Sequence, residues 1–553
     1  MTFFKKMILT LLLLIMGCST NNDVIEEKIE SDTLALFYET GTTNFNNGKD
    51  SLDEVVWKND SVTSLIKVDS SKNDNINIQA SNLTNEEYTI DSNNIFIGFM
   101  KEVEATNNND KKDKYLDIIT NKNEIIVKEN SIAFLKIFIP ENTIPGNYSG
   151  HIHITKNKEE ISLPINITVK DYTLTKESFT YELWQYPYSS YKYYDYNEPF
   201  SKEHNEYLEK TLDLYTKTGG DSLTVSIVDE PWGHQTADAY PSMIKWYKNP
   251  DNTWYYDYTH FDKWIDLSLN TNSFNKIKAF SILPINNRLG YFDIALDKDQ
   301  ALILEPGSED YNYIYGMFLS SFIAHLDELD IFDITYIAID ERAFEYIEST
   351  INLINQYPNK DGKILKISSY FNYLPKEIAI TNQIHDISIG ESVIQKNLKD
   401  IKPFISNRIN NNLSTSMYTC TDQYPNSFTF SNPYESTWTM LYALSFDTNG
   451  FVRWALDAFN ENSLLNTDNN LYESGDTFLI YPGEDSPYTS IRYEMLEIGL
   501  NYVNKFKYLS NILDKAELEL LYNLLVEISN SKNIKTNEII EQVNTFKHLI
   551  DEK

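Results

Sequence analysis

The sequence contains only 2 cysteines, Cys18 and Cys420, among 553 residues. They do not form a disulfide framework, but a chain of this length can bury large cores and predicts two to four domains. Histidine is also scarce, and of 8 residues only His151 and His153 lie close together, in a predicted strand. Without a neighbouring Cys or acidic partner, they are typical of strand-face residues rather than zinc ligands. The sequence shows no metal motif and no glycine-rich phosphate loop, so we predict neither a metal nor a cofactor.

Positive charge is in short supply as well. The chain has 47 Lys and Arg against 81 Asp and Glu, a formal net charge of −34. A surface this negative repels phosphate backbones, so we do not expect nucleic-acid binding, and basic patches for an anionic membrane are equally disfavoured. The hydrophobic fraction of 41% is normal for a folded protein. A neutral or weakly charged substrate fits this composition best.

Long apolar runs are confined to the N-terminus. The first eighteen residues read MTFFKKMILTLLLLIMGC, and the apolar part is shorter than the ~20 residues of a membrane-spanning helix. The stretch ends in a Gly-Cys that resembles a lipobox, so we predict a signal peptide over 1–17 and a lipidated Cys18. The alternative is an ordinary signal peptide with a chance cysteine. Residues 18–32 are polar and predict a flexible tether. We therefore expect a protein of the cell envelope, facing outside the cytoplasm and touching the membrane only through its lipid.

Short strands separated by Asn, Asp and Gly turns predict a β-sandwich over residues 33–172. Runs such as NIFIGFM (94–100) and GHIHITK (150–156) alternate apolar and polar residues as half-buried strands do. This spacing is typical of two packed sheets. The region shows no obvious binding platform, so we expect a structural role for it.

Strand-like and helical stretches alternate over residues 173–490. Apolar runs such as LTVSIV (223–228) and ITYIAI (334–339) are separated by polar loops and longer amphipathic stretches. This rhythm predicts a (β/α)8, TIM-like barrel with its active site at the C-terminal ends of the strands. Residues 491–553 predict a helical C-terminal segment packed on the barrel.

Paired carboxylates are candidates for acid–base chemistry such as glycosidic cleavage. Two Asp-Glu dipeptides, Asp229-Glu230 and Asp340-Glu341, directly follow buried strand-like runs, so both would project at the catalytic end of a barrel. Because neighbours in a strand point to opposite faces, both carboxylates reach one site only if the chain bends at the strand end. The residues alone leave the choice between these pairs open. Three further dipeptides fall in predicted structural contexts: Asp53-Glu54 in the sandwich, Asp327-Glu328 in a helix and Asp551-Glu552 in the tail.

Tryptophans at predicted strand ends are candidate sugar platforms, because sugars present apolar CH faces to aromatic rings. Trp184, Trp232 and Trp454 occupy such positions. Core packing is an equally good interpretation for any one of them in a chain with 39 tyrosines. Their polar neighbours favour the functional interpretation; these are Gln185, Gln235, Arg453 and Asp457.

Seven ordered stretches resemble one family: ELWQYPYSSYKYY, DEPWGHQTADAYPSMIKW, TWYYDYTHFDKW, ITYIAIDERAF, YTCTDQYPNSFTFSNPYESTW, GFVRWALDAF and GDTFLIYPGEDSPYTSIRYE. Their content and order are similar to glycoside hydrolase family 123, the β-N-acetylgalactosaminidases. The resemblance implies a β-sandwich followed by a (β/α)8 barrel. It also implies a retaining, substrate-assisted cleavage of a glycan that carries N-acetylhexosamine, without a cofactor.

By this resemblance the catalytic pair falls on Asp340 and Glu341 in IAIDER. Glu341 is expected to act as the general acid and then as the base, and Asp340 to orient the acetamido N–H and stabilise the oxazolinium charge. Asp229 and Glu230 become residues near the rim. The substrate contacts expected on the matching motifs are Trp184, Trp232, Gln235, Tyr418, Trp454 and Asp457.

Two stretches depart from the family pattern. After Ser490-Ile491-Arg492 the chain continues EIGLNYVNKF, without the expected acidic-aromatic stretch, and residues 369–378 (SYFNYLPKEI) match only loosely. Linkage and leaving-group preference therefore stay open. The alternatives are a hydrolase of the same mechanism with β-N-acetylglucosaminidase or endo-acting specificity, and a surface glycan-binding lipoprotein without catalysis. The intact Asp340-Glu341 pair counts against the binding protein.

Overall fold

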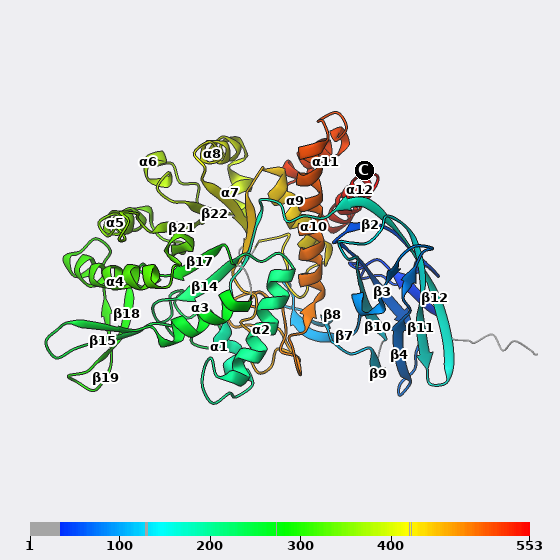
Figure 1. Ribbon diagram of the computed structural model, residues 1–553, viewed down its shortest axis with the longest axis horizontal. Coiled ribbons are helices and arrows are strands. Elements are labelled where there is room, and N and C mark those ends of the chain that lie inside the picture. Colours follow the sequence, from blue (N-terminus) through cyan, green and yellow to red (C-terminus); the bar gives the residue numbers. More distant parts are fainter. Residues whose placement is uncertain (1–33, 128–130, 272–273, 420, 422) are drawn as a thin grey trace, which may run out of the picture.

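The computed structural model of the protein describes residues 34–127, 131–271, 274–419, 421 and 423–553. The predicted signal peptide, Cys18 and the tether lie outside these residues. Figure 1 shows a β-sandwich at one end, an α/β barrel toward the other, and C-terminal helices between them. Within the described ranges, no helix combines the length and the apolar character needed to cross a membrane. The order of sandwich, TIM-like barrel and helical segment confirms the predicted fold class.

Two mostly antiparallel sheets form the sandwich, and apolar side chains fill the space between them. Strand β11 shows the pattern: Ile152 and Ile154 are buried, whereas His151 and His153 face outward, as predicted for residues of a strand face. The first sheet has the order β1 (Ala35–Tyr38), β3 (Ser61–Val68), β10 (Ile132–Phe138), β7 (Ile95–Thr106), β8 (Lys112–Ile119) and β25 (Thr489–Ser490). The second has the order β2 (Leu52–Lys58), β12 (Glu159–Thr173), β11 (Gly146–Lys156), β4 (Asn75–Ala80) and β9 (Glu124–Ile126), with β5 (Leu83–Thr84) beside β11 and β6 (Thr89–Ile90) beside β5.

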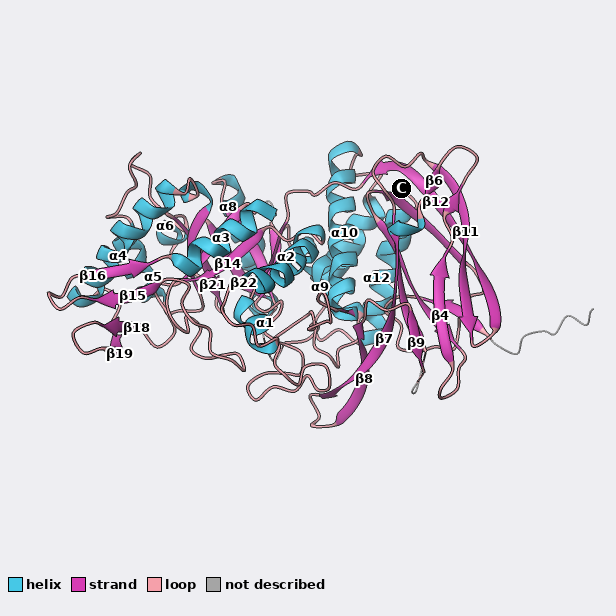
Figure 2. Cartoon of the chain, turned by 60° about the horizontal axis from the view of Figure 1, so that its bottom comes forward, coloured by secondary structure: helices cyan, strands magenta, loops and turns pink. Residues whose placement is uncertain are grey.

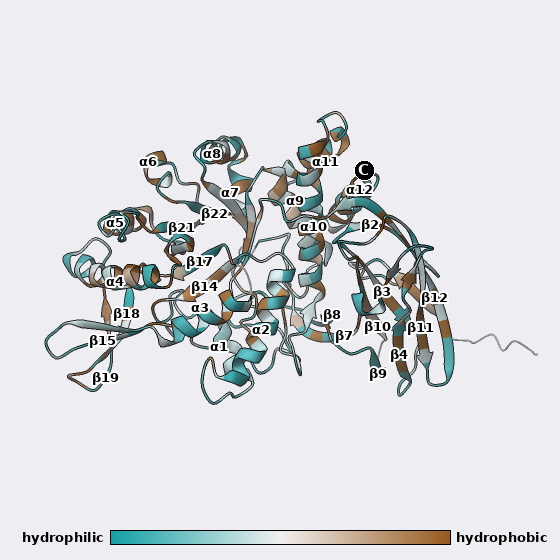
Figure 3. Cartoon of the chain, viewed as in Figure 1, coloured by the Kyte–Doolittle hydropathy of each residue, from teal (hydrophilic) through white to brown (hydrophobic). Residues whose placement is uncertain are grey.

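Figure 3 shows hydrophobic residues on β14 and on the sandwich strands. Eight parallel strands form the barrel. Their central residues are buried on both faces because helices cover the outside and side chains fill the inside. In chain order the strands are β13 (Thr180–Leu183), β14 (Ser222–Ser226), β17 (Lys276–Phe280), β20 (Thr335–Ile339), β21 (Lys366–Phe371), β22 (Asp386–Gly390), β23 (Ser414–Tyr418) and β24 (Gly450–Arg453).

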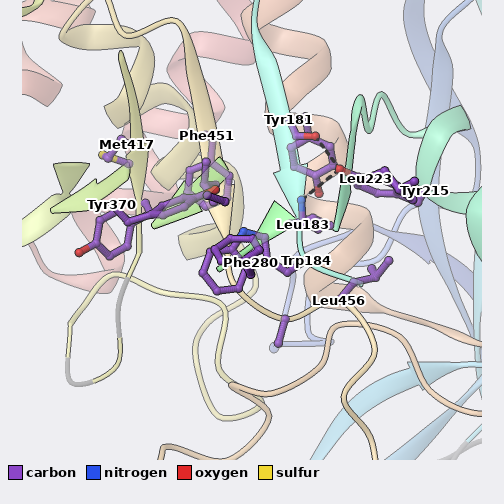
Figure 4. Close-up of a cluster of buried hydrophobic side chains, with 14 of the residues drawn as sticks. Tyr181, Leu183, Trp184, Tyr215, Leu223, Phe280, Tyr370, Met417, Phe451 and Leu456 are labelled. Atoms are coloured by element: carbon purple, nitrogen blue, oxygen red, sulfur yellow. Dashed lines mark hydrogen bonds between the residues drawn. The ribbon is translucent and has the colours of Figure 1, made fainter. Parts of the chain in front are cut away.

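The barrel closes through a backbone ladder between β13 and β24, whereas side chains bridge the seam between β13 and β14. The Gln185 side-chain oxygen accepts the Thr224 N–H at 2.8 Å. The Tyr215 hydroxyl lies between the two strands: it is 3.0 Å from the Tyr181 carbonyl of β13 (Figure 4) and 3.3 Å from the Ser222 carbonyl of β14, and it accepts the Leu183 N–H at 3.1 Å. Gln185, a polar neighbour of Trp184 in the sequence, is therefore part of the barrel's closure.

Helices surround the barrel, and a four-stranded arm extends from it at the lower left of Figure 1. The arm consists of β15 (Lys245–Lys248), β16 (Trp254–Asp257), β18 (Arg288–Asp293) and β19 (Lys298–Ile303). The helices are α1 (Pro187–Tyr193), α2 (Lys202–Lys217), α3 (Thr259–Thr271), α4 (Glu309–Glu328), α5 (Phe344–Ile354), α6 (Ile378–Thr381), α7 (Glu391–Lys396), α8 (Leu398–Asn410) and α9 (Tyr434–Ser445).

The C-terminal helices α10 (Ile491–Ile512), α11 (Glu519–Ser529) and α12 (Thr536–Asp551) lie between barrel and sandwich in Figures 1 and 2. Helix α10 packs on α9 of the barrel. On its other side Lys136 of β10 forms ion pairs with Glu494 and Glu497 of α10, at 3.1 and 2.6 Å. The tail therefore joins the two large domains.

Candidate active site

The candidate active site is a cavity of about 240 Å³ at the C-terminal ends of the barrel strands, where TIM barrels place their catalytic residues. Five strand ends contribute to it: those of β13, β20, β21, β23 and β24. Six residues expected to contact substrate or catalyse the reaction meet there from separate parts of the chain. Among the described residues the lining consists of Trp184, Gln235, Asp340, Glu341, Tyr370, Tyr418, Thr419, Thr421, Val452, Trp454 and Tyr472.

A larger cleft, of about 370 Å³, lies between the sandwich and the helical tail. Its charged side chains pair with one another: Lys505 lies 2.8 Å from Asp60, and Lys547 lies 2.8 Å from Glu54. It is remote from the strand ends where barrel chemistry occurs. The smaller cavity is therefore the candidate site, despite its size.

Asp340 and Glu341 both reach the cavity because β20 ends at Ile339. Inside a strand the two side chains would point to opposite faces. The chain leaves the strand conformation at Asp340 and bends at Glu341, so both carboxylates lie on the same side. The buried strand TYIAI before them, packed in the barrel core, fixes where this bend occurs.

Both carboxylate oxygens of Glu341 have partners. The Tyr418 hydroxyl donates a short hydrogen bond to Oε1. The Asn372 side-chain amide donates to Oε2 at 2.7 Å. Two bonds to opposite oxygens hold the carboxylate in one orientation, because hydrogen bonds to a carboxylate are strong and directional. Asn372 was not predicted from the sequence, because it lies in the stretch 369–378 that matches the family pattern only loosely. Its position directly after the strand β21 was a signal that could have indicated it.

Asp340 keeps part of its surface open to the cavity. The surrounding protein and, secondly, the negative charge of Glu341 raise the pKa of Asp340 to about 7. Asp340 therefore keeps its proton up to near-neutral pH. This proton is the one that an acid catalyst needs.

One wall of the cavity consists of Trp184 and Tyr370, which lie near Phe280 in Figure 4. The buried carboxylate of Glu182 accepts from both: from the Trp184 indole N–H at 2.9 Å, and from the Tyr370 hydroxyl in a short bond. Lys278 lies 3.6 Å from the other oxygen of Glu182. This buried charge pair fixes the two rings from inside the barrel.

Trp454 and Tyr472 form another part of the lining, with ring centroids 5.2 Å apart at 75°. The Trp454 indole N–H donates to Asp476 Oδ2 at 3.2 Å. Asp476 is fully buried and also pairs with Arg453 at 2.8 Å. The indole is therefore anchored at its nitrogen and leaves ring surface for a ligand.

Trp232 and Asp457 lie behind the cavity wall rather than in the described lining. The Trp232 ring stacks on Trp184 with centroids 5.4 Å apart. Asp457 accepts the Tyr186 N–H at 2.7 Å, and burial raises its pKa to about 7. Trp232 therefore supports the Trp184 ring from behind, and Asp457 holds the backbone that follows Trp184. Direct substrate contact stays a prediction for Trp184, Gln235, Tyr418 and Trp454.

The competing pair, Asp229-Glu230, is absent from the described lining. Asp229 accepts the Ser242 N–H at 2.8 Å, and Glu230 accepts the Tyr240 N–H at 2.6 Å. The two carboxylates thus close the loop that carries Gln235. The remaining Asp-Glu pairs lie in β2, at the end of α4 and at the end of α12.

Five further residues of the lining were not predicted from the sequence: Tyr370, Thr419, Thr421, Val452 and Tyr472. Tyr370, Thr419 and Val452 lie at or next to strand ends, which was a usable signal. Tyr472 lies in the long segment between β24 and β25, where the sequence has no strand or helix pattern to place it.

Comparisons with known proteins agree with this geometry. The model of the glycoside hydrolase 123 catalytic domain matches residues 184–509, and that of the glycoside hydrolase 123 N-terminal domain matches residues 32–156. The structure of a family 123 glycoside hydrolase from Clostridium perfringens, studied for glycolipid glycan hydrolysis, is 33% identical. It superposes with a TM-score of 0.87 over 94% of this chain and 98% of that one.

More distant structures are similar only at a low level. A xylanase from Clostridium thermocellum is 10% identical with a TM-score of 0.34, over 85% of this chain and 95% of that one. No curated protein matches the chain in sequence. The two domain matches and the Clostridium perfringens structure, together with paired carboxylates at a barrel strand end, show that this chain belongs to glycoside hydrolase family 123 and is a glycoside hydrolase.

Proposed function

We propose that the protein releases β-linked N-acetylgalactosamine from glycans by a retaining, substrate-assisted reaction. The observation that supports this most is the placement of Asp340 and Glu341 side by side in one cavity, with Glu341 held at both oxygens. Adjacent carboxylates suit a mechanism in which the substrate's own acetamido group is the nucleophile, because they act on neighbouring substituents of one sugar.

In the first step the acetamido carbonyl oxygen forms a bond to the anomeric carbon while the glycosidic C–O bond breaks. Glu341 gives its proton to the leaving oxygen, and the product is an oxazolinium ion. In the second step a water molecule attacks the anomeric carbon, the bond to the acetamido oxygen breaks, and Glu341 takes the proton from the water. The two inversions at the anomeric carbon give net retention.

Asp340 accepts the acetamido N–H and so directs the carbonyl oxygen toward the anomeric carbon. In the empty site the proton resides on Asp340, because burial and the charge of Glu341 raise the pKa of Asp340 to about 7. A bound acetamido N–H and the positive charge that develops beside it favour ionised Asp340. Binding thus transfers the proton to Glu341, where the leaving group needs it.

The lining suits a neutral sugar. Trp184, Tyr418 and Trp454 offer aromatic rings for apolar CH faces, and Gln235 and the threonines offer hydrogen bonds to hydroxyls. Since the similar Clostridium perfringens protein was studied for glycolipid glycan hydrolysis, we extend the proposed substrates to glycolipids with terminal β-N-acetylgalactosamine. The proposed lipid on Cys18 would hold the enzyme at the cell envelope, outside the cytoplasm.

The test uses a form that begins at residue 19, assayed on 4-nitrophenyl β-N-acetylgalactosaminide, β-N-acetylglucosaminide and β-galactoside. We expect cleavage of the first alone, a large loss of activity in Asp340→Asn, a smaller loss in Glu341→Gln because a nitrophenolate leaves with little help from an acid, and inhibition by a thiazoline analogue of the oxazoline. Cleavage of the galactoside, which has no acetamido group, would contradict the mechanism.

If the enzyme prefers the glucosaminide, its substrate sugar is N-acetylglucosamine, the C4 epimer. Failure on all three substrates, followed by cleavage of an intact glycolipid glycan, would assign an endo-acting enzyme. Binding without cleavage of any glycan would contradict the proposal in favour of a glycan-binding protein.

A further inference from the structure

The segment between β24 and β25, residues 454–488, forms part of the cavity lining and also lies against the sandwich. We call it the β24–β25 loop. It has little regular secondary structure of its own, yet Trp454 and Tyr472 from it line the cavity. The loop has hydrogen bonds of its own, such as the Gly475 N–H to the Thr467 carbonyl at 2.9 Å, and contacts with the sandwich add to them in holding the two rings in place.

Backbone contacts with the sandwich hairpin β7–β8 supply the first part of that support. Glu104 of β7 donates its N–H to the Leu465 carbonyl at 3.0 Å, and its carbonyl accepts the Thr467 N–H at 2.9 Å. The loop thus adds a short parallel bridge to the strand β7. This contact joins the two domains through the main chain.

Thr106, the last residue of β7, binds the loop next to Tyr472. Its N–H and its hydroxyl donate to the two oxygens of Asp468, at 2.7 and 2.9 Å. Its carbonyl accepts the Ser474 hydroxyl at 2.9 Å. Tyr472 lies between these two anchored positions, so the end of β7 determines the path of the chain around it.

Asp117 of β8 supports the loop from its other side through Arg492. The Arg492 guanidinium donates to both Asp117 oxygens at 2.9 to 3.0 Å, and both side chains are buried. The remaining guanidinium nitrogen donates to the carbonyls of Gly475 and Phe478, at 2.9 and 3.0 Å. These carbonyls flank Asp476, the residue that anchors the Trp454 indole.

Gly475 shows how closely the guanidinium fits. Its φ is +79°, and a Cβ there would lie 3.2 Å from Arg492 and 2.1 Å from the Thr429 hydroxyl. A separate apolar cluster joins the same elements: Val103 and Ile118 of the hairpin pack with residues of the loop, which are Phe459, Phe478, Tyr481 and Tyr488. Hydrogen bonds, a buried ion pair and apolar packing all connect the hairpin to the loop.

We propose that the sandwich contributes to sugar binding at the active site. Its residues Asp117 and Thr106 are positioning residues that hold Trp454 and Tyr472 against the bound sugar. Neither residue touches the cavity; both act through the β24–β25 loop. The domain is thus no independent module. The effect on sugar binding rests on the proposed function of the cavity, whereas the effect on the loop does not.

The test compares Thr106→Val and Asp117→Asn with wild type in the full chain. Thr106→Val removes one hydroxyl bond to Asp468 at nearly constant volume. We expect KM for the glycoside to rise about five-fold, the equivalent of one hydrogen bond, with kcat changed less. Amide hydrogen exchange over residues 465–478 should accelerate in the same variants. Thr106→Ser, which keeps the hydroxyl, should restore both values.

Lys136→Met is the matched control, because Lys136 also joins the sandwich to α10 but through Glu494 and Glu497, outside the loop. It should lower thermal stability and leave KM and loop exchange unchanged. Equal effects of Lys136→Met and Thr106→Val, or wild-type KM and exchange in Thr106→Val, would overturn the proposal. If Asp117→Asn does not fold, Thr106→Val and Ser474→Ala decide. Should wild type cleave no N-acetylhexosaminide, the proposed function fails, while loop exchange still tests the positioning role.

Discussion

Replacing Asp340 with Asn should make the protein more stable while it strongly lowers activity, and the gain in stability should depend on pH. The carboxyl of Asp340 has a pKa of about 7 in the folded protein, against 3.8 as its ordinary value. Between these values the native state keeps a proton that the unfolded chain has lost. Wild-type stability from this group therefore falls as pH rises from about 4 to about 7 and stays low above that. Asn has no charge to bury, so the variant does not lose stability in this way as pH rises.

The size of the effect follows from the pKa difference. About 3 pKa units correspond to roughly 4 kcal/mol. Asp340 is partly open to the cavity, so solvent screening reduces this figure, and we expect about 2 kcal/mol at pH 8 and almost nothing at pH 4.5. Activity should fall about 10²- to 10³-fold, as when a group that stabilises transition-state charge is removed.

Thermal unfolding of wild type and Asp340→Asn at pH 4.5, 6 and 8 measures this difference. The gap in Tm should widen with pH and stop widening above pH 7. Asp485→Asn, at an exposed loop carboxylate, is the control and should show no pH-dependent gap. In a Glu341→Gln background the gap should shrink, because the like charge that helps raise the pKa of Asp340 is gone. A gap that is constant with pH, or a less stable Asp340→Asn at pH 8, would refute the reasoning.

Other consequences are testable in the same way. Glu341→Gln should lower kcat about 10²- to 10⁴-fold on glycans with alcohol leaving groups but much less on nitrophenyl glycosides, whose leaving group needs little protonation; equal losses on both would argue against an acid role. For wild type, kcat/KM should decline as pH rises through about 7, because Asp340, whose pKa is about 7, then loses its proton. A profile that stays flat to pH 9 would contradict this. Lys278→Met should destabilise the fold by about 3–5 kcal/mol, as measured by denaturant unfolding, because it removes a cation that pairs with buried Asp386 at 2.6 Å and with buried Glu182 at 3.6 Å. Cys18→Ser should move the protein from the membrane fraction to the soluble fraction of cells; unchanged fractionation would argue against the lipid anchor.

Local patterns predicted the architecture well, and particular elements show why. The alternation in GHIHITK places Ile152 and Ile154 inside the sandwich and the two histidines outside. The apolar run ITYIAI at 334–339 corresponds to β20, which extends over Thr335–Ile339. Such periodicities depend on neighbours within a few residues, and burial of one face follows from them directly.

The residues of the site could be predicted from the sequence only in part. The rule that catalytic residues follow barrel strands selected both Asp229-Glu230 and Asp340-Glu341, and it cannot choose between them because both follow buried runs. The structure separates them: the first pair binds backbone N–H groups of its own loop, and the second faces the cavity. The same holds for Trp184 and Trp232, which stack on each other while only Trp184 lines the cavity.

By itself, then, the sequence determined the order of sandwich, barrel and helical tail and the end of the strand β20 at Ile339, and hence that Asp340 and Glu341 could project at the catalytic face. These depend on side-chain periodicity and turn chemistry along a few residues. Tertiary structure alone decided that Asn372 and Tyr418 meet on Glu341, that Glu182 holds two rings of the wall, and that Asp117 of the sandwich supports a loop of the barrel. These contacts join residues that are between 2 and 375 positions apart, and closure of the barrel and docking of the two domains create nearly all of them, which no local pattern encodes.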